Sequence, residues 1–276
     1  MFYKYICIYI YSILVLILNK YICIYIYSIL VLILSVFIIE KGDKMNAIIL
    51  VAGIGTRLYP LSKYIPKPLI KVNNETFLER QIMFLKESGI NDITLVTGYL
   101  KEKFNFLKKK YNVDIVYNNK YNIYNNIYSL YLVRHLLNET YILNGDIFYK
   151  NNPFNNRFEK TTYISPKKQY FNNEWVLSVD SNNKLEKISI SSGENEYIIC
   201  GGAYFNKNNS LILKKHLEDI YKNKKKLLKT YYWDNIVLEH FDEMDDIYIH
   251  HLNDNDIYEV DTLYEYYNLK NLIENK

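Results

Sequence analysis

The sequence that decides the fold reads AIILVAGIGTRLYPLSKYIPKPL over residues 47–69. It opens with a continuous apolar run at residues 47–51, which predicts a strand buried on both faces of a parallel sheet. A loop containing Gly53 and Gly55 follows, and glycine lets backbone N–H groups approach phosphate oxygens because it has no Cβ atom in the way. The loop lacks the Gly-Lys-Ser/Thr ending of a P-loop and the third glycine of a dinucleotide-binding motif. The stretch therefore predicts a strand followed by a phosphate-binding loop of a different kind.

Strand-like and helix-like segments alternate after this stretch. Amphipathic helical spacing is clearest at residues 75–88, where the apolar stripe closes on Gly89, a typical helix C-cap residue. The further expected strands are 93–97, 113–117 and 141–143, and the further expected helices are 100–110 and 127–137. This alternation predicts an α/β fold with a doubly wound, mainly parallel, Rossmann-like sheet and right-handed crossovers.

The pattern changes beyond Asp146. Short alternating segments indicate antiparallel strands at 161–165, 175–179, 185–190 and 197–205. Helical stretches at 207–221 and 232–240, a strand at 247–251 and a helix from Thr262 are expected to complete the chain. Open α/β sheets bind ligands at the carboxyl ends of their strands, so we expect this half to form the acceptor-binding side of a cleft there. Residues 45–276 are then expected to form a single domain.

The first 44 residues are a separate, hydrophobic segment. Residues 4–18 read KYICIYIYSILVLIL, and residues 20–34 repeat them letter for letter. One interpretation is translated upstream DNA that has been duplicated, with Met45 as the true start, and the exact repeat favours it. The other is a membrane anchor, because residues 21–39 could just cross a bilayer, which needs about 20 apolar residues.

Composition excludes several classes of protein. Hydrophobic residues make up 49% and charged residues 23% of the 276 residues, which predicts a folded protein with a sizeable core. The net charge of +4 is too small to indicate nucleic-acid binding. The three cysteines offer neither a disulfide framework nor metal-ligand spacing, which favours a reduced, cytoplasmic setting. The oligomeric state stays open.

Taken with its neighbours, the glycine loop resembles a known signature. Gly53–Leu61 and the following Pro66-Lys67-Pro68-Leu69 match the loops of nucleotidyltransferases, the family that includes the sugar-1-phosphate nucleotidylyltransferases. The similarity is greatest to the bacterial phosphocholine cytidylyltransferases. It continues through residues 89–92, 98–100, 124–130, 233–235 and 257–261, and so covers nearly all of residues 45–276. Two departures are Val51, where members commonly carry alanine, and Asn144, where many carry an acid.

The resemblance implies how the nucleotide binds. Lys67 is expected to act catalytically, since an ammonium group beside the α-phosphate offsets the charge that builds there during in-line attack. Arg57 is expected to hold the β- and γ-phosphates with its planar guanidinium. The expected nucleotide-binding residues are the loop residues Ala52, Gly53, Gly55 and Thr56, together with Gly98, Asn126 and Ser129 over the base and ribose.

The resemblance also implies a magnesium site. Asp146 and Asp261 both come at expected strand ends, and together they are expected to bind Mg²⁺, which prefers one or two carboxylates plus phosphate oxygens and water. Asp261 has an alternative role as the N-cap of the last helix, because Thr262 and an apolar-periodic run follow it.

The acceptor side is expected to hold an aromatic cage. A trimethylammonium group has no hydrogen-bond donor, so its recognition needs aromatic faces and nearby carboxylates. The two tryptophans of the chain, Trp175 and Trp233, each adjoin an acid, Glu174 and Asp234 respectively, and Tyr232 lies beside them in sequence. These five residues are the expected acceptor-binding set, with core packing as the alternative role of the tryptophans.

These patterns predict an enzyme that transfers CMP from CTP to phosphocholine, giving CDP-choline and pyrophosphate. Alternatives are a sugar-1-phosphate nucleotidylyltransferase using UTP, GTP or dTTP, and a non-catalytic nucleotide-sensing module. A membrane glycosyltransferase is a further alternative, since Asp254-Asn-Asp256 matches an Asp-x-Asp metal motif. The choice between choline and related amines such as ethanolamine stays open.

Overall fold

The computed structural model describes residues 45–274. The predictions made for the duplicated segment, including the membrane span at residues 21–39, lie outside the described residues. Within residues 45–274, none of the helices has both the length and the apolar character needed to cross a bilayer. Met45–Lys276 forms one compact unit.

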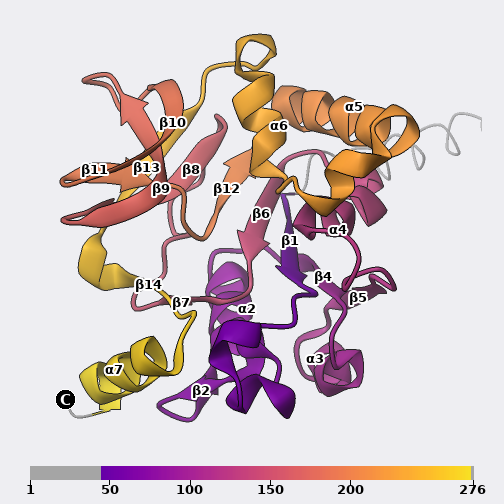
Figure 1. Ribbon diagram of the computed structural model, residues 1–276, viewed down its shortest axis with the longest axis vertical. Helices are drawn as coiled ribbons and strands as arrows, with labels where there is room; N and C mark the ends of the chain where they lie inside the picture. The colour runs from indigo at the N-terminus through magenta and orange to yellow at the C-terminus, as the bar shows by residue number, and fades with distance from the viewer. Residues whose placement is uncertain (1–44, 275–276) are drawn as a thin grey trace, which may run out of the picture. The chain divides into compact units, whose positions relative to one another are not determined.

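Four parallel strands form one half of the sheet, in the order β5, β4, β1, β6 from its edge inward (Figure 1). They are β1 (Asn46–Val51), β4 (Asp92–Thr97), β5 (Asp114–Tyr117) and β6 (Thr140–Asn144). β1 is buried on both faces, as its continuous apolar run predicts. The mainly parallel, doubly wound sheet expected from the sequence is confirmed.

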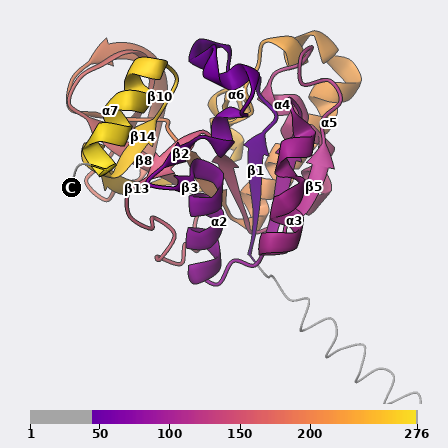
Figure 2. The ribbon, with the colours of Figure 1, turned by 90° about the horizontal axis from the view of Figure 1, so that it is seen from below.

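Helices cover both faces of this parallel half of the sheet (Figures 1 and 2). On one face, Ala47, Ile49 and Val51 of β1 belong to the same core as α2 (Phe77–Glu87) and α3 (Asn105–Tyr111). On the other face, Ile48 and Leu50 share a core with α4 (Asn126–Leu132), α5 (Lys207–Asn223) and α6 (Asp234–Glu239). The period of two along a strand thus divides the core into two layers.

An antiparallel extension continues the sheet beyond β6. β12 (Gly202–Phe205) pairs antiparallel with both β6 and β8 (Thr162–Lys168). Beyond β8 come β11 (Glu196–Ile198), β9 (Phe171–Val179) and β10 (Leu185–Gly193), while β13 (Tyr248–Asn253) pairs parallel with β8. The segment 197–205, expected as one strand, forms two, because β11 pairs with β8 and β9 whereas β12 pairs with β6.

Short elements that the sequence patterns did not delimit connect parts of the chain on either side of the main sheet strands in sequence. β2 (Lys71–Val72) and β3 (Glu75–Thr76) form a small hairpin before α2. β7 (Ile147–Tyr149) pairs antiparallel with β14 (Ile257–Glu259), with Ile147 opposite Glu259. This pairing brings residues 259–261 beside Asp146, far away in sequence. The C-terminal helix is α7 (Leu263–Glu274), and the 3₁₀ turns are η1 (Thr56–Leu58), η2 (Leu61–Lys63), η3 (Lys67–Leu69), η4 (Lys101–Phe104), η5 (Arg134–Leu136), η6 (Lys225–Lys229), η7 (Phe241–Glu243) and η8 (Asp254–Asp256).

Candidate active site

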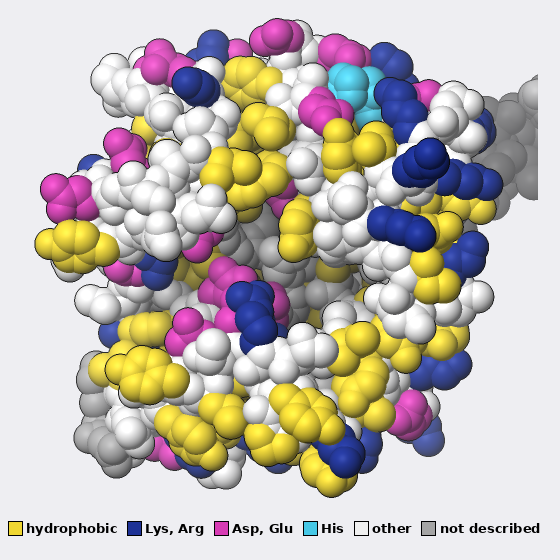
Figure 3. Space-filling model, in the orientation of Figure 1, with side chains coloured by type: hydrophobic (Ala, Val, Ile, Leu, Met, Phe, Trp, Pro, Cys, Tyr) yellow, Lys and Arg dark blue, Asp and Glu magenta, His cyan; other side chains and the backbone are white. Residues whose placement is uncertain are grey.

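A cleft of about 660 Å³ lies where the parallel strands end and the antiparallel extension begins. Figure 3 shows it as a central hollow with acidic and basic side chains gathered at its rim. It meets a smaller cavity of about 240 Å³, and the two share Gly53, Arg57, Asp146 and Asp261. The glycine loop therefore lies at the junction of a large subsite and a small one.

The smaller cavity is formed by the loop after β1. Gly53, Gly55 and Thr56 line it together with Lys67. Gly55 has φ 67°, in the left-handed region that favours glycine, and a Cβ atom there would lie 3.2 Å from the Cβ atom of Lys67. The loop needs this glycine to turn into η1 while Lys67 packs closely beneath it.

Lys67 connects the loop to two aspartates from distant parts of the chain. Its Nζ lies 2.8 Å from Asp146 Oδ2 and 2.6 Å from Asp261 Oδ1. Burial lowers the pKa of Lys67, but the charges and hydrogen bonds of the two aspartates outweigh burial and hold it above its usual value. Arg57 Nη2 lies 2.9 Å from Asp261 Oδ2, from the exposed side. Two cations are thus held at the junction of the cavities, where a triphosphate could pair with them.

Three carboxylates meet at the same point. One oxygen each of Asp146, Glu259 and Asp261 lies within 4.8 Å of the others. Glu259 is exposed to solvent in part, and desolvation and the charges of the two aspartates raise its pKa to about 7. A divalent cation relieves such repulsion, and carboxylate oxygens are the ligands that Mg²⁺ prefers. The donor set therefore fits this ion.

The structure gives the capping role weighed for Asp261 to another residue. Its side chain pairs with Lys67 and Arg57, while the Thr262 hydroxyl accepts the N–H of Glu265 at 3.2 Å and so caps α7. The Glu265 carboxylate accepts in return from the N–H of Thr262, which completes a capping box. Glu259 was missed in the sequence, although residues two apart on a strand share a face and Glu259 precedes Asp261 by two.

The large cleft also contains residues that were predicted to bind the nucleotide. Ala52, Asn126 and Ser129 line it, joined by Asn118, whose Nδ2 donates to Ser129 Oγ at 2.9 Å. Gly98 lines neither cavity, which corrects the expectation that it contacts the nucleotide directly. A Cβ atom there would come within 2.6 Å of the Ala52 carbonyl oxygen and of Tyr121, so Gly98 lets these cleft-lining residues approach each other.

Four of the five predicted acceptor residues line the other part of the large cleft. They are Glu174 and Trp175 on β9, and Tyr232 and Asp234 at the start of α6. Burial raises the pKa of Asp234 to about 7, since hydrogen bonds from Tyr163, 3.2 Å away, and from a backbone N–H offset only part of its effect. Burial raises the pKa of Glu174 as well. This wall of the cleft therefore combines aromatic side chains with carboxyl groups whose ionised forms a nearby cation would stabilise.

The prediction for Trp233 is wrong. Its side chain is fully buried and lines neither cavity. The indole packs in the core under the sheet, with its ring centroid 5.7 Å from that of Phe205 and 6.3 Å from that of Tyr163. Its neighbours Tyr232 and Asp234 face the cleft, so the chain turns the indole inward where α6 begins. The backbone N–H of Trp233 still contributes, because it donates to Asn126 Oδ1 at 3.0 Å.

The Asp-x-Asp sequence lies away from the cleft. Asp254 pairs with Lys168 at 2.5 Å, and Asp256 accepts hydrogen bonds from Asn151 and Asn253. Neither aspartate lines either cavity. These contacts give the pair a structural role and remove the main sequence argument for a glycosyltransferase.

Comparisons with known proteins agree with this geometry. The family model described as nucleotidyl transferase matches residues 46–168. The chain is 38% identical over 232 residues to a choline-phosphate cytidylyltransferase of Streptococcus pneumoniae, which covers 84% of this chain and 100% of the relative. It is 34% identical over 230 residues to a 2-aminoethylphosphonate cytidylyltransferase of Lancefieldella rimae, covering 82% and 92% of the two chains. The solved structure of CTP:phosphocholine cytidylyltransferase from Streptococcus pneumoniae superposes with a TM-score of 0.79 at 38% identity, over 83% of this chain and 99% of that one.

Proposed function

The chain belongs to the nucleotidyl transferase family, and from that premise we propose that it transfers CMP from CTP to phosphocholine, forming CDP-choline and releasing pyrophosphate. An oxygen of the phosphocholine phosphate attacks the α-phosphorus of CTP in line. The bond between that phosphorus and the bridging oxygen of the pyrophosphate breaks as the new bond forms. The attacking phosphate is already ionised at neutral pH, so the step needs no general base.

The residues at the junction of the two cavities support this step. Lys67 stabilises the charge that spreads over the oxygens of the α-phosphate, and Arg57 holds the leaving pyrophosphate. Asp146 and Asp261, with Glu259 beside them, would hold Mg²⁺, which would supply Lewis-acid stabilisation of the phosphate oxygens. In the substrate-free protein the Lys67 ammonium group pairs with both aspartates, so their charges are balanced before the triphosphate binds.

The observation that carries the choice of acceptor is that Trp175 and Asp234 line the same cleft. A buried carboxylate with a pKa of about 7 is stabilised by a cation, and an indole face attracts one that has no hydrogen to donate. A sugar phosphate needs hydrogen-bonding groups instead. Tyr232 and Glu174 enlarge the same wall, so phosphocholine fits its chemistry better than a sugar phosphate does.

Trp175→Leu is expected to raise KM for phosphocholine by roughly thirtyfold, because the loss of a desolvated cation–π contact costs about 2 kcal/mol. KM for CTP is expected to stay within about twofold, since the triphosphate binds at the glycine loop. Steady-state kinetics with each substrate varied in turn check both values. Trp175→Phe is the matched control, and it should keep most of the affinity because an aromatic face remains.

Unfolding measurements on the leucine variants distinguish the two tryptophans. Trp233→Leu creates a cavity in the core and is expected to lower the free energy of unfolding by about 2 to 4 kcal/mol. Trp175→Leu should change it far less, because Trp175 is only half buried. An unchanged phosphocholine KM in a folded Trp175→Leu protein would remove this residue from the acceptor site.

Asp234 predicts a pH dependence of stability. Its folded-state pKa of about 7 lies above the ordinary value of 3.8, so the folded protein binds a proton more tightly than the unfolded chain does. Stability without substrate therefore falls as pH rises from about 4 to about 7, by at most roughly 4 kcal/mol. Asp234→Asn removes this term, and urea unfolding at pH 5 and pH 8 should show the variant gaining stability over the wild type at the higher pH. An equal difference at both pH values would contradict the raised pKa.

A primary-amine acceptor is the second candidate. The relative from Lancefieldella rimae carries 2-aminoethylphosphonate in its name, and the carboxylates Glu174 and Asp234 could accept hydrogen bonds from an ammonium group. Trp175 favours the quaternary amine, because a trimethylammonium group gains from a π face without losing hydrogen bonds. The Trp175→Leu variant should accordingly lose more activity with phosphocholine than with phosphoethanolamine.

The catalytic unit in this proposal is residues 45–276, and the role of residues 1–44 stays a prediction from the sequence. A cytoplasmic location is part of the proposal and is supported by the free, buried thiol of Cys200. A non-catalytic sensing role is disfavoured because Lys67, Asp146 and Asp261 meet in one place, as the reaction requires.

A further inference from the structure

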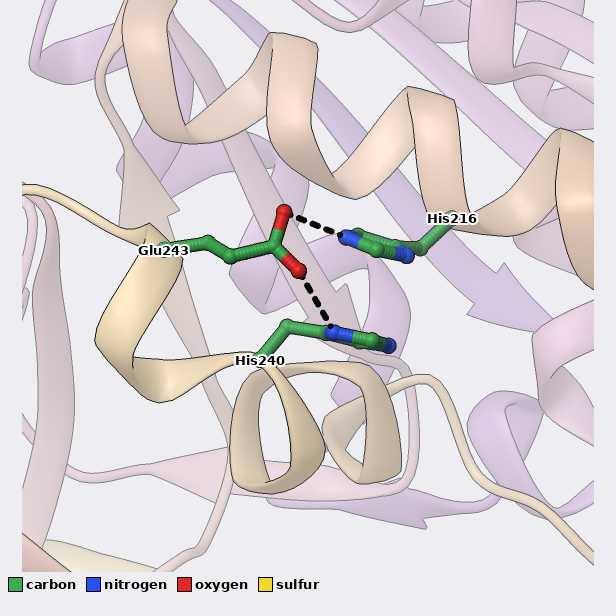
Figure 4. A group of neighbouring side chains, drawn as sticks. All are labelled: His216, His240 and Glu243. Carbon is green, nitrogen blue, oxygen red and sulfur yellow. Dashed lines mark hydrogen bonds and ion pairs between the residues drawn. The ribbon is translucent and has the colours of Figure 1, made fainter.

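Two histidines and a glutamate cluster outside the cleft, on the α5–α6 side of the molecule (Figure 4). His216 lies on α5, His240 directly follows α6, and Glu243 ends η7. His216 Nε2 is 3.1 Å from Glu243 Oε2, and His240 Nδ1 is 2.9 Å from Glu243 Oε1. The two imidazole rings are stacked, with centroids 3.4 Å apart and planes 12° from parallel.

We propose that His216, His240 and Glu243 bind a divalent transition-metal ion, with Zn²⁺ as the best match. Two imidazoles and one carboxylate form a ligand set suited to zinc, and they leave a fourth position for water. Imidazole ligands disfavour Mg²⁺ and Ca²⁺, which take oxygen ligands. The ligand set therefore selects an ion different from the one proposed at the active site.

The spacing of the donor atoms supports this assignment. One donor atom from each residue lies within 4.8 Å of the other two. Zinc at about 2.0–2.2 Å from tetrahedral ligands separates the donors by roughly 3.4 Å, which falls inside the 4.8 Å within which these donor atoms already lie. One nitrogen of each imidazole ring already points at the Glu243 carboxylate in Figure 4. A small tilt of the rings and a retreat of Glu243 would let their lone pairs converge on one ion.

The surroundings of His216 and Glu243 suit metal binding. His216 is buried, and burial lowers its pKa, which favours the neutral imidazole that ligates metals. Glu243 is ionised, because its hydrogen bonds with Lys215 and the two histidines lower its pKa to about 2. Lys215 Nζ lies 3.0 Å from Glu243 Oε2 and marks the solvent side, where the fourth ligand position would open.

A metal here would fasten the end of α6 to α5. α6 spans six residues, or about 9 Å, and its first residue is Asp234 in the acceptor wall. The ion would thus hold the helix that carries Asp234 without touching substrate, and its role would be structural. This inference does not depend on which acceptor the enzyme uses.

Zinc binding to the chelator-treated full chain tests the proposal. Isothermal titration with Zn²⁺ is expected to give one site with a micromolar or lower Kd, and Co²⁺ is expected to give visible absorption bands of a low-symmetry site. The melting temperature should rise by about 5–10 °C when free Zn²⁺ is 100-fold above Kd. His240→Gln should raise Kd at least thirtyfold and remove the shift.

Two matched variants make the result specific. His251→Gln changes a histidine outside the cluster, and Asp146→Asn changes the active-site carboxylates that could also attract zinc. Both should keep the tight site. The proposal is overturned if His240→Gln binds zinc as the wild type does, if Asp146→Asn abolishes binding, or if zinc leaves the melting temperature unchanged. His240 is only half buried, so its replacement should not prevent folding as that of His216 could.

Discussion

Asp261→Asn and Asp146→Asn are each expected to lower kcat by roughly a hundred- to a thousandfold in saturating Mg²⁺. Each removes a carboxylate charge from the cluster proposed to hold Mg²⁺, and loss of about 3 to 4 kcal/mol of transition-state stabilisation corresponds to that factor. The melting temperature should change by only a few degrees. Asp261→Asn isolates the charge especially well, because Thr262 rather than Asp261 caps α7.

Asp254→Asn is the matched control for both variants. It removes an aspartate that pairs with Lys168 outside the cleft, so kcat should remain close to that of the wild type. Steady-state rates measured over a range of Mg²⁺ concentrations separate weaker metal binding, which excess Mg²⁺ restores, from a direct effect on the reaction. Normal magnesium-dependent turnover in either active-site variant would remove that aspartate from the metal site.

Lys67→Met should lower kcat by roughly a hundred- to a thousandfold, with KM for phosphocholine changed less than about threefold. Removing one preorganised donor from the charge that develops in a transition state costs about this much. Methionine keeps the length of the side chain, so the packing beneath Gly55 should survive. The exposed Lys63 lies four residues earlier, and Lys63→Met is the matched control that should leave kcat unchanged.

Lys67 also offsets the negative charge of the carboxylate cluster, and the same variant tests this second role. Without the ammonium group, Asp146 loses its cation and Asp261 keeps only its contact with Arg57. The variant is therefore expected to be less stable than the wild type without Mg²⁺ and to recover when Mg²⁺ is added. A thermal shift series with and without Mg²⁺ checks this, and near-normal kcat in the variant would show that Lys67 does not act on the reacting phosphate.

Local patterns in the sequence were sufficient for the central fold. The continuous apolar run of β1 and the helical spacing of α2 report burial directly, and both elements lie where those patterns put them. β7 and β14 could not be found in this way, because each has three residues and depends on a partner about 110 residues away. That pairing is what brings Glu259 and Asp261 to Asp146.

The two tryptophans show how far site residues can be predicted from the sequence. Both adjoin an acid and both lie in the acceptor half, so composition and spacing treat them alike. Only the entry into α6 decides that Trp233 turns into the core while Tyr232 and Asp234 turn to the cleft. Tyr121 lines the cleft without any distinguishing signal, since it is one of 30 tyrosines.

The most direct test of the central claim is pyrophosphate release from a grid of nucleotides and acceptors. CTP, UTP, GTP and dTTP are each combined with phosphocholine, phosphoethanolamine, 2-aminoethylphosphonate and glucose 1-phosphate, with Mg²⁺ present. We expect the highest kcat/KM with CTP and phosphocholine, and CDP-choline as the product. A clear preference for a sugar phosphate, or pyrophosphate release that does not depend on phosphocholine, would contradict the account.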